Sequence, residues 1–246
     1  DNVEWLLHDG DLEKMARRVA EVSPTSVVHC ANHYVLHHEA KDVDPMIDAN
    51  IRLGALLLGA LGDTGTHFVN LSTFFQRQGV GGTKPNSLYA ATKQAFAEIV
   101  RWFGVHSNIR TCDLMLYDTY GPGDRRKKLI PHLLNMAVSG GTVEIETPDA
   151  EMNLCYIDDV VAAISHVVTQ GIIGEWSVRA TANCRVTDIV SAIEEITNCT
   201  VVEKFGTRQP HASPRLDGPP ILNDWSPVWD LRSGIEACWK SLQVVK

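Results

Sequence analysis

A tyrosine and a lysine stand four residues apart in the segment Asn86–Ala97, which reads Asn-Ser-Leu-Tyr-Ala-Ala-Thr-Lys-Gln-Ala-Phe-Ala. On a helix, Tyr89 and Lys93 would share one face. A nearby ammonium favours the phenolate form, so Lys93 would lower the tyrosine pKa from its usual value of about 10. Such a tyrosine can donate a proton to, or accept one from, a carbonyl or carbinol oxygen. The pattern predicts an acid/base pair, although an isolated match also describes many surface pairs.

The elements that must position this pair alternate along the first half of the chain. Short uncharged runs typical of buried strands are separated by longer amphipathic segments typical of helices. Alternation of this kind predicts βαβ units and a mostly parallel sheet. The expected strands are 3–7, 26–30, 66–71 and 110–116, and the expected helices are 11–22, 44–61 and 88–105.

The character of the chain changes after Tyr120-Gly-Pro-Gly-Asp124. We expect an α/β fold, a Rossmann-like doubly wound sheet with a small C-terminal substrate lobe. Residues 1–118 and 154–180 would form the NAD(P)-binding domain, and 119–153 and 181–246 the lobe. The elements expected in this part are helices 129–138, 158–169 and 230–242 and a short strand 142–146.

Composition narrows the class of protein. The 246 residues are 44% hydrophobic and carry a net charge of -8, which argues against a general electrostatic grip on nucleic acid or anionic membranes. The longest apolar run, 53–61, is too short to span a bilayer. Six scattered cysteines without a Cys-x-x-Cys pair favour reduced thiols. We expect a cytoplasmic protein that binds neither nucleic acid nor membrane.

Several short stretches, taken in order, resemble the extended short-chain dehydrogenase/reductases, the epimerase/dehydratase branch that acts on sugar nucleotides. Each stretch alone is a weak indication of the family, because it can occur by chance. Their occurrence in the same order along nearly the whole chain is much more specific. The matching stretches are Gly10-Asp11-Leu12, Val27-Val-His-Cys-Ala31, Asn50-x-x-x-Gly54, Ser72-Thr73, Tyr89-x-x-x-Lys93, Tyr120-Gly-Pro-Gly-Asp124 and Tyr156-Ile-Asp-Asp-Val160.

The resemblance implies a role for each matched residue. Tyr89 would exchange a proton with the sugar oxygen, Thr73 would hydrogen-bond the same oxygen, and Lys93 would bind the nicotinamide ribose. It also implies a homodimer formed through helices 44–61 and 88–105. Together with Tyr89 and Lys93, the residues implied to contact NAD or NADP are Asp11, Leu12, Cys30, Ala31, Asn32 and Asn50. Those implied to contact a nucleotide-sugar are Thr73, Phe74, Asp118 and Leu129.

Departures from the family pattern indicate which of the family's reactions this chain could catalyse. Dehydratases carry Asp-Glu after the catalytic Thr, whereas Phe74-Phe75 stands here. Many epimerases carry Arg before the second late signature to hold the substrate diphosphate, and Met152-Asn153 occupies that place. The phrases around Thr73, Tyr89 and Asp118 resemble the 4-keto reductases that finish 3,6-dideoxyhexoses, such as CDP-abequose and CDP-paratose synthases. The alternatives are a sugar-nucleotide 4-epimerase and a non-catalytic binding protein with a degraded Rossmann fold.

The glycine-rich turn that a Rossmann enzyme places after its first strand has no counterpart in these residues. Gly79–Gly82 stands in a loop between a strand and a helix, at the wrong place. We expect that the family pattern begins here at its third strand and that the first βαβ portion is missing, because the residues are a piece of a longer chain or omit a disordered region.

Four features admit structural explanations. The histidines at 29, 33 and 37 lie on no common face, so we expect no metal site. Asp158-Asp159 is better explained by a helix N-terminus than by acid/base work. Arg125-Arg-Lys-Lys128 could bind substrate phosphates or form a solvated charge run. Asn50 could simply tie its helix to a loop.

Overall fold

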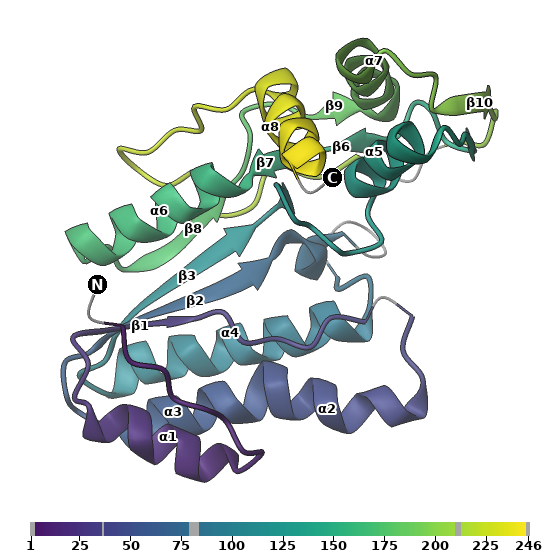
Figure 1. Ribbon diagram of the computed structural model, residues 1–246. Coiled ribbons are helices and arrows are strands. Elements are labelled where there is room, and N and C mark those ends of the chain that lie inside the picture. Colours follow the sequence, from purple (N-terminus) through teal and green to yellow (C-terminus); the bar gives the residue numbers. More distant parts are fainter. Residues whose placement is uncertain (1–2, 36, 79–83, 210–212, 245–246) are drawn as a thin grey trace. The chain divides into compact units, whose positions relative to one another are not determined.

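Strands and helices alternate through the chain in a computed structural model that describes residues 3–35, 37–78, 84–209 and 213–244 (Figure 1). Gly79–Gly82 lies outside the described residues. The chain divides into two compact units, Asp1–Met115 with Val167–Trp176, and Leu116–His166 with Ser177–Lys246. The assignment of cofactor and substrate binding to separate parts of the chain stays a prediction.

The first unit is built on a parallel sheet with the strand order β1-β2-β3-β8. Strands β1 and β2 pair in parallel from Ser26 opposite His67 to His29 opposite Asn70. Helices α3 and α4 lie along one face of this sheet (Figure 1). The expected α/β class is confirmed. The strands are β1 (Ser26–His29), β2 (His67–Thr73), β3 (Arg110–Leu116) and β8 (Gly174–Val178), and the helices are α1 (Leu12–Glu21), α2 (Val43–Ile47), α3 (Leu53–Leu61) and α4 (Leu88–His106).

The described part of this unit also contains three short helical segments. They are the 3-10 turn Ala40–Asp42, the π turn Asp48–Arg52 that joins α2 to α3, and the 3-10 turn Phe74–Arg77 after β2.

The core of the first unit forms where α3 and α4 meet. Phe68 of β2 and Phe96 of α4 are fully buried, with rings edge to face at 6.4 Å between centroids. Gly54 of α3 faces the Phe96 ring so closely that a methyl group there would collide with it. The match Asn50-x-x-x-Gly54 therefore has a packing reason, because only glycine allows this helix–helix approach.

The prediction of a strand at 3–7 is wrong. The segment is irregular, and Trp5 and Leu7 are each 86% exposed. A strand forms only where its backbone N–H and C=O groups find a neighbouring strand, and no strand among the described residues pairs with this one. Apolar character alone was misleading here.

Within residues 116–166, 177–209 and 213–244, the second unit has three two-stranded sheets and four helices. Strands β4 and β7 pair in parallel, as do β10 and β5, whereas β6 and β9 are antiparallel. Leu133 of α5, Ile189 and Ile193 of α7, and Ile235 of α8 are fully buried in one core. The helices are α5 (Leu129–Ser139), α6 (Ile157–Gln170), α7 (Val186–Thr197) and α8 (Leu231–Val244), and the strands are β4 (Asp118–Tyr120), β5 (Val143–Ile145), β6 (Glu151–Met152), β7 (Leu154–Tyr156), β9 (Cys184–Arg185) and β10 (Val202–Phe205).

Candidate active site

Helix α4 carries the tyrosine and the lysine on its first two turns. Ser87 is the N-cap, and its hydroxyl accepts a hydrogen bond from the Ala90 N–H at 3.2 Å. This cap starts the helix two residues before Tyr89. Tyr89 and Lys93 are then one turn apart, as the four-residue spacing predicted.

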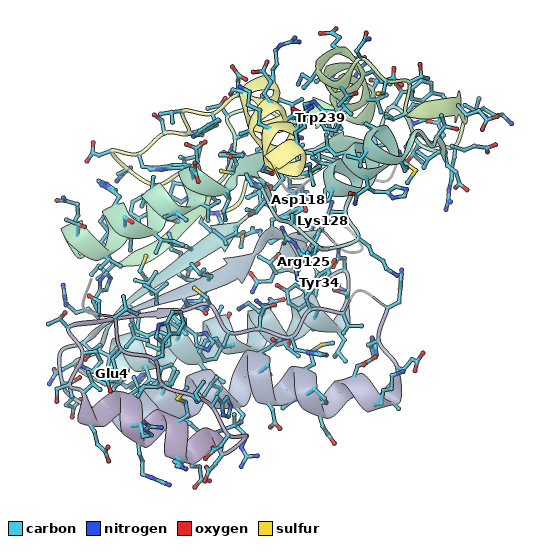
Figure 2. The ribbon with its side chains drawn as sticks, viewed as in Figure 1. Glu4, Tyr34, Asp118, Arg125, Lys128 and Trp239 are labelled. Atoms are coloured by element: carbon cyan, nitrogen blue, oxygen red, sulfur yellow. The ribbon has the colours of Figure 1, made fainter. Side chains whose placement is uncertain are left out.

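A second tyrosine lies against the first. The rings of Tyr34 and Tyr89 meet edge to face, with centroids 4.8 Å apart. Tyr34 comes from the irregular segment after β1 and is 39% exposed (Figure 2). Tyr89 itself is partly buried. The segment after β1 therefore contributes to the immediate surroundings of the candidate proton donor, which the sequence did not indicate.

Lys93 is almost fully buried, with 2% of its surface exposed. Burial lowers the pKa of its ammonium to about 8, and the charge of Asp113 and the Cys30 side chain oppose that shift. The lysine therefore remains largely charged at neutral pH, which lies about one unit below this pKa. A buried ammonium one turn from Tyr89 has the character that the acid/base prediction requires. Its effect on the tyrosine pKa stays a prediction.

The two hydroxyls at the end of β2 have different partners. Ser72 donates its hydroxyl to Asp113 Oδ2 at 2.6 Å. Thr73 is 7% exposed, and its Oγ1 accepts the Phe75 N–H at 3.4 Å as the cap of the following turn. Since the Ser72 proton is used within the sheet, Thr73 is the better candidate to hydrogen-bond a substrate oxygen.

Asn50 lies at the centre of the π turn between α2 and α3 and is fully buried. Its Oδ1 accepts the His33 N–H at 2.7 Å, and its Nδ2 donates to His33 O at 3.1 Å and to Thr92 Oγ1 at 2.9 Å. Thr92 in turn donates to the carbonyl of Tyr89 at 2.8 Å. Both amide hydrogens are used, so this geometry favours the structural explanation, in which Asn50 ties the segment after β1 to α4.

Replacing Asn50 by Ala is expected to lower the free energy of unfolding of the first unit by about 1–3 kcal/mol. The His33 backbone groups and the Thr92 hydroxyl would lose buried partners. Urea denaturation measures the loss. The control is Asp48→Ala on the same π turn, because Asp48 is half-exposed and, among the described residues, forms an ion pair with Arg52 alone, at 3.6 Å. Such surface pairs contribute little. Equal stability of the two variants would contradict the tying role.

Of the other residues predicted to contact the cofactor, Leu12 is partly buried and the remaining four are exposed. Asp11 is the N-cap of α1 and accepts the Lys14 N–H at 2.9 Å, with Leu12 as the first helical residue. Cys30, Ala31 and Asn32 follow β1 directly and are exposed. Asp11 thus has a structural use of its own, and the segment 30–32 is accessible at the carboxyl end of β1, where a cofactor would lie in an α/β sheet.

In the second unit, Asp118 and Lys128 form an ion pair of 2.7 Å (Figure 2). Asp118 opens β4, and Lys128 is the N-cap of α5, immediately before Leu129. A cavity of about 620 Å³ is lined by 125–129 together with His132 and Asn135. Arg126 pairs with Asp124 and donates to Thr119 O. No ion pair of the described residues involves Arg125 or Lys127, so this cavity has free positive charge.

Asn153, which occupies the expected place of the diphosphate-binding arginine, is fully buried. Its Nδ2 donates to the Ala180 and Ala182 carbonyls, and its Oδ1 accepts the Ala180 N–H at 2.9 Å. It connects segments within the second unit and has no cationic group to offer a phosphate.

The prediction that Asp159 caps the first turn of its own helix is wrong in its partners. Asp159 is 2% exposed and accepts the backbone N–H groups of Val228 and Trp229 at 2.9 and 3.1 Å. Those donors belong to the segment before α8 rather than to the first turn of α6. Asp159 therefore holds the segment before α8 by two hydrogen bonds, which the sequence did not indicate.

Two further observations concern other ligands. Among residues 3–35, 37–78, 84–209 and 213–244, no three His, Cys, Asp or Glu side chains are placed to hold a metal ion. Within the same residues, no helix has both the length and the apolar character to cross a membrane. The six cysteines are free thiols.

One buried polar residue of this region, Asp113, was not among the residues predicted from the sequence. Asp113 stands inside β3 between the buried residues Cys112 and Leu114, and it is 9% exposed. Its only signal in the sequence is a single carboxylate between apolar residues of this strand. Buried carboxylates are rare unless they are paired.

Comparisons with known proteins found a matching family and similar proteins. The sequence profile of the NAD dependent epimerase/dehydratase family matches residues 3–177. CDP-abequose synthase of Yersinia pseudotuberculosis is 26% identical over 162 residues, covering 64% of this chain and 56% of that protein. The chain spans about half the length of the curated relatives it matches.

Solved structures show the same fold. A UDP-glucuronic acid 4-epimerase from Bacillus cereus, in complex with UDP-glucuronic acid and NAD, is 21% identical and superposes with a TM-score of 0.75. That match covers 97% of this chain and 80% of the epimerase. RMD from Pseudomonas aeruginosa, complexed with NADPH, is 16% identical with a TM-score of 0.78, covering 97% and 89%.

Proposed function

Because this chain belongs to the NAD dependent epimerase/dehydratase family, we propose that it serves an oxidoreductase that acts on a nucleotide-linked sugar with NAD or NADP. The observation that carries this proposal is the buried Lys93 one helical turn from Tyr89, on the helix that follows the Thr73 strand end. The more specific proposal is the reduction of a 4-keto-deoxysugar.

In that reaction each residue has one task. Tyr89 gives its hydroxyl proton to the carbonyl oxygen of the sugar, and Thr73 hydrogen-bonds the same oxygen. Lys93 remains charged and stabilises the phenolate that is left. The nicotinamide supplies the hydride when it is bound. Phe74, buried directly after Thr73, supplies no acid or base, and this supports reduction over elimination of water.

The residues present fit the nicotinamide half of the cofactor better than its pyrophosphate. The buried ammonium of Lys93 can donate to a ribose hydroxyl, and the segment 30–32 is accessible after β1. No glycine-rich turn after a strand is found among the described residues of the first unit. The structures of similar fold contain NAD in one case and NADPH in another, so the choice of cofactor stays open between them.

The substrate diphosphate has a proposed place in the second unit. Asn153 offers no cation, whereas the cavity of about 620 Å³ is lined by Arg125 and Lys127 at the N-terminus of α5. A helix N-terminus with free basic side chains favours phosphate groups. Leu129 and the Asp118–Lys128 pair would border this group. The relatives named CDP-abequose synthase support a cytidine diphosphate as the carrier.

The test is the cofactor stoichiometry of the full polypeptide with a CDP-linked 4-keto-3,6-dideoxyhexose. We expect one reduced nicotinamide to be oxidised for each sugar reduced, measured by nicotinamide absorbance together with chromatography of the sugar product. Interconversion of two sugar nucleotides without net oxidation would instead support the 4-epimerase. Binding of either ligand by calorimetry without any turnover would support the non-catalytic alternative.

We also propose a homodimer formed through α2, α3 and α4. Three large apolar residues on these helices are exposed, namely Ile47, Trp102 and Val105 at 38%, 54% and 71%. Exposed apolar groups of this kind suit a helix–helix interface. A monomer in sedimentation velocity of the full polypeptide would contradict it.

A further inference from the structure

The ion pair between Asp118 and Lys128 is largely shielded from solvent (Figure 2). Lys128 Nζ donates to Asp118 Oδ1 at 2.7 Å, and the two side chains are 22% and 10% exposed, the lysine being the more exposed. Exposed ion pairs exchange readily with water and hold neither partner in one place. A pair removed from water has a defined geometry instead, because its charges depend on each other.

The carboxylate is the fixed member of the pair. Asp118 opens β4 and lies opposite Leu154 in the parallel pairing of β4 with β7. Its backbone N–H donates to Asn153 O at 3.1 Å, and only 8% of the residue is exposed. The family resemblance implied that Asp118 contacts the nucleotide-sugar. One of its oxygens is engaged by Lys128, so its contact with a ligand could be indirect.

Lys128 differs in this respect from Arg125 and Lys127, which line the same cavity of about 620 Å³. Both of those residues are exposed, and no ion pair of the described residues involves them. A long basic side chain that moves freely in water loses much rotamer freedom when it binds a ligand. Lys128 has already lost this freedom, because Asp118 holds its end. An ammonium has three N–H donors, so two remain for a ligand.

We propose that Asp118 is a positioning residue, which holds the Lys128 ammonium at the wall of this cavity so that a phosphate group meets an ordered donor. The proposal rests on the proposed function for the identity of the ligand, the diphosphate of a nucleotide-linked sugar. Arg125 and Lys127 supply the net attraction, since Asp118 balances the charge of Lys128. A purely structural pair would join β4 to the start of α5, and phosphate binding would not depend on where Lys128 is held.

The experiment compares Asp118→Asn with Asp118→Ala in the full polypeptide, with inorganic pyrophosphate as the probe and calorimetry as the measurement. Both variants remove the same negative charge, so their net charges are equal. Asparagine keeps an oxygen that can accept a hydrogen bond from Lys128, whereas alanine has none. We expect the Ala variant to bind pyrophosphate about tenfold more weakly than the Asn variant, because the lysine must then be ordered by the ligand.

The same comparison in a Lys128→Met background is the matched control. If Asp118 acts through Lys128, the difference between the Asn and Ala variants should vanish there, because a double-mutant cycle isolates the pair. A difference that persists without the lysine would mean that the side chain at position 118 contacts the phosphate itself, and it would overturn the proposal. Equal affinities of the Asn and Ala variants with Lys128 present would overturn it too, as would a parent protein that binds no pyrophosphate.

Two further variants keep the test decisive. Lys127→Gln removes one net charge from the cavity and should weaken pyrophosphate binding in the parent protein and in every variant. An unchanged affinity would place the probe outside this cavity and overturn the proposal. Should Asp118→Ala fail to fold, Asp118→Ser replaces it, because the serine hydroxyl lies one bond closer to the backbone than Asp118 Oδ1 and cannot reach Lys128.

Pyrophosphate binding needs neither cofactor nor turnover, so these outcomes are separate from those of the proposed function. A difference that depends on Lys128, in a protein that reduces no sugar nucleotide, would support the positioning role and refute the reaction. Equal affinities in an active reductase would do the reverse. In an active enzyme the difference between the Asn and Ala variants should appear in KM rather than in kcat, because the phosphate is bound equally before and during the reaction.

Discussion

Replacing Tyr89 by Phe is expected to lower kcat/KM for the sugar nucleotide by about 10²–10⁴, the usual contribution of a positioned general acid. The change removes one oxygen atom and keeps the aromatic ring that meets Tyr34 at 4.8 Å. The helix and its Ser87 cap are not altered. The loss should therefore appear in turnover, with little change in thermal stability.

Tyr34→Phe is the matched control for this prediction. It removes the same atom from the neighbouring ring and preserves the same ring contact. Since Tyr34 is not expected to give a proton to the sugar, its kcat/KM should remain within about tenfold of the parent value, well short of the loss of a general acid. If Tyr89→Phe also stays within that range, or if Tyr34→Phe loses as much activity, the assignment of Tyr89 as the proton donor is wrong.

Replacing Phe96 by Ala is expected to lower the free energy of unfolding of the first unit by about 3–5 kcal/mol. The Phe96 ring is fully buried, lies 5.0 Å from the His29 ring and 6.4 Å from the Phe68 ring, and fills the space in front of Gly54. Its removal leaves a cavity between α3, α4 and the sheet. Because the chain has two units, unfolding should be followed by hydrogen exchange resolved along the sequence.

Two variants sharpen the test of Phe96. Phe205→Ala makes the same chemical change at a residue that is 47% exposed, where a loss well below that of a core position is expected. Gly54→Ala alone should destabilise the first unit, because the new methyl group collides with the Phe96 ring. In the background of Phe96→Ala that penalty should disappear. Additive losses in the double variant would show that the two residues do not pack as described.

Much of the first unit could be predicted from the sequence. Strand β3 was predicted with its observed bounds, and α4 within one residue, because long periodic segments with caps and apolar runs determine their own limits. The prediction of a strand at 3–7 was wrong because a strand needs a neighbouring strand to pair with, and the local pattern of residues does not show whether one is present. In the second unit, strands of two or three residues such as β6 and β7 are defined by their pairing alone.

The site was predictable only as far as spacing on a single helix allows. Tyr89 and Lys93 on successive turns follow from four-residue periodicity. Three contacts join segments that are distant in sequence, so no local pattern could reveal them. They are the ring contact of Tyr34 with Tyr89, the hydrogen bond of Asn50 with Thr92 and that of Asp113 with Ser72. Whether a polar residue contacts a bound molecule or holds two segments of the protein together depends on its burial. Burial is a property of the folded chain and cannot be seen in a local sequence pattern.

The π turn Asp48–Arg52 also determines how this chain should be aligned with its relatives. The buried positions Met46, Asn50, Gly54 and Leu58 recur every four residues. In a regular α-helix each such step overshoots one turn by about 40°, so three steps would rotate one end of the series away from the sheet. The wide turn accommodates one additional residue and restores the phase. Where a relative has a regular helix at this place, we expect the one-residue gap just before Asn50, at 48–49, because the spacing Asn50-x-x-x-Gly54 already resembles that of the family.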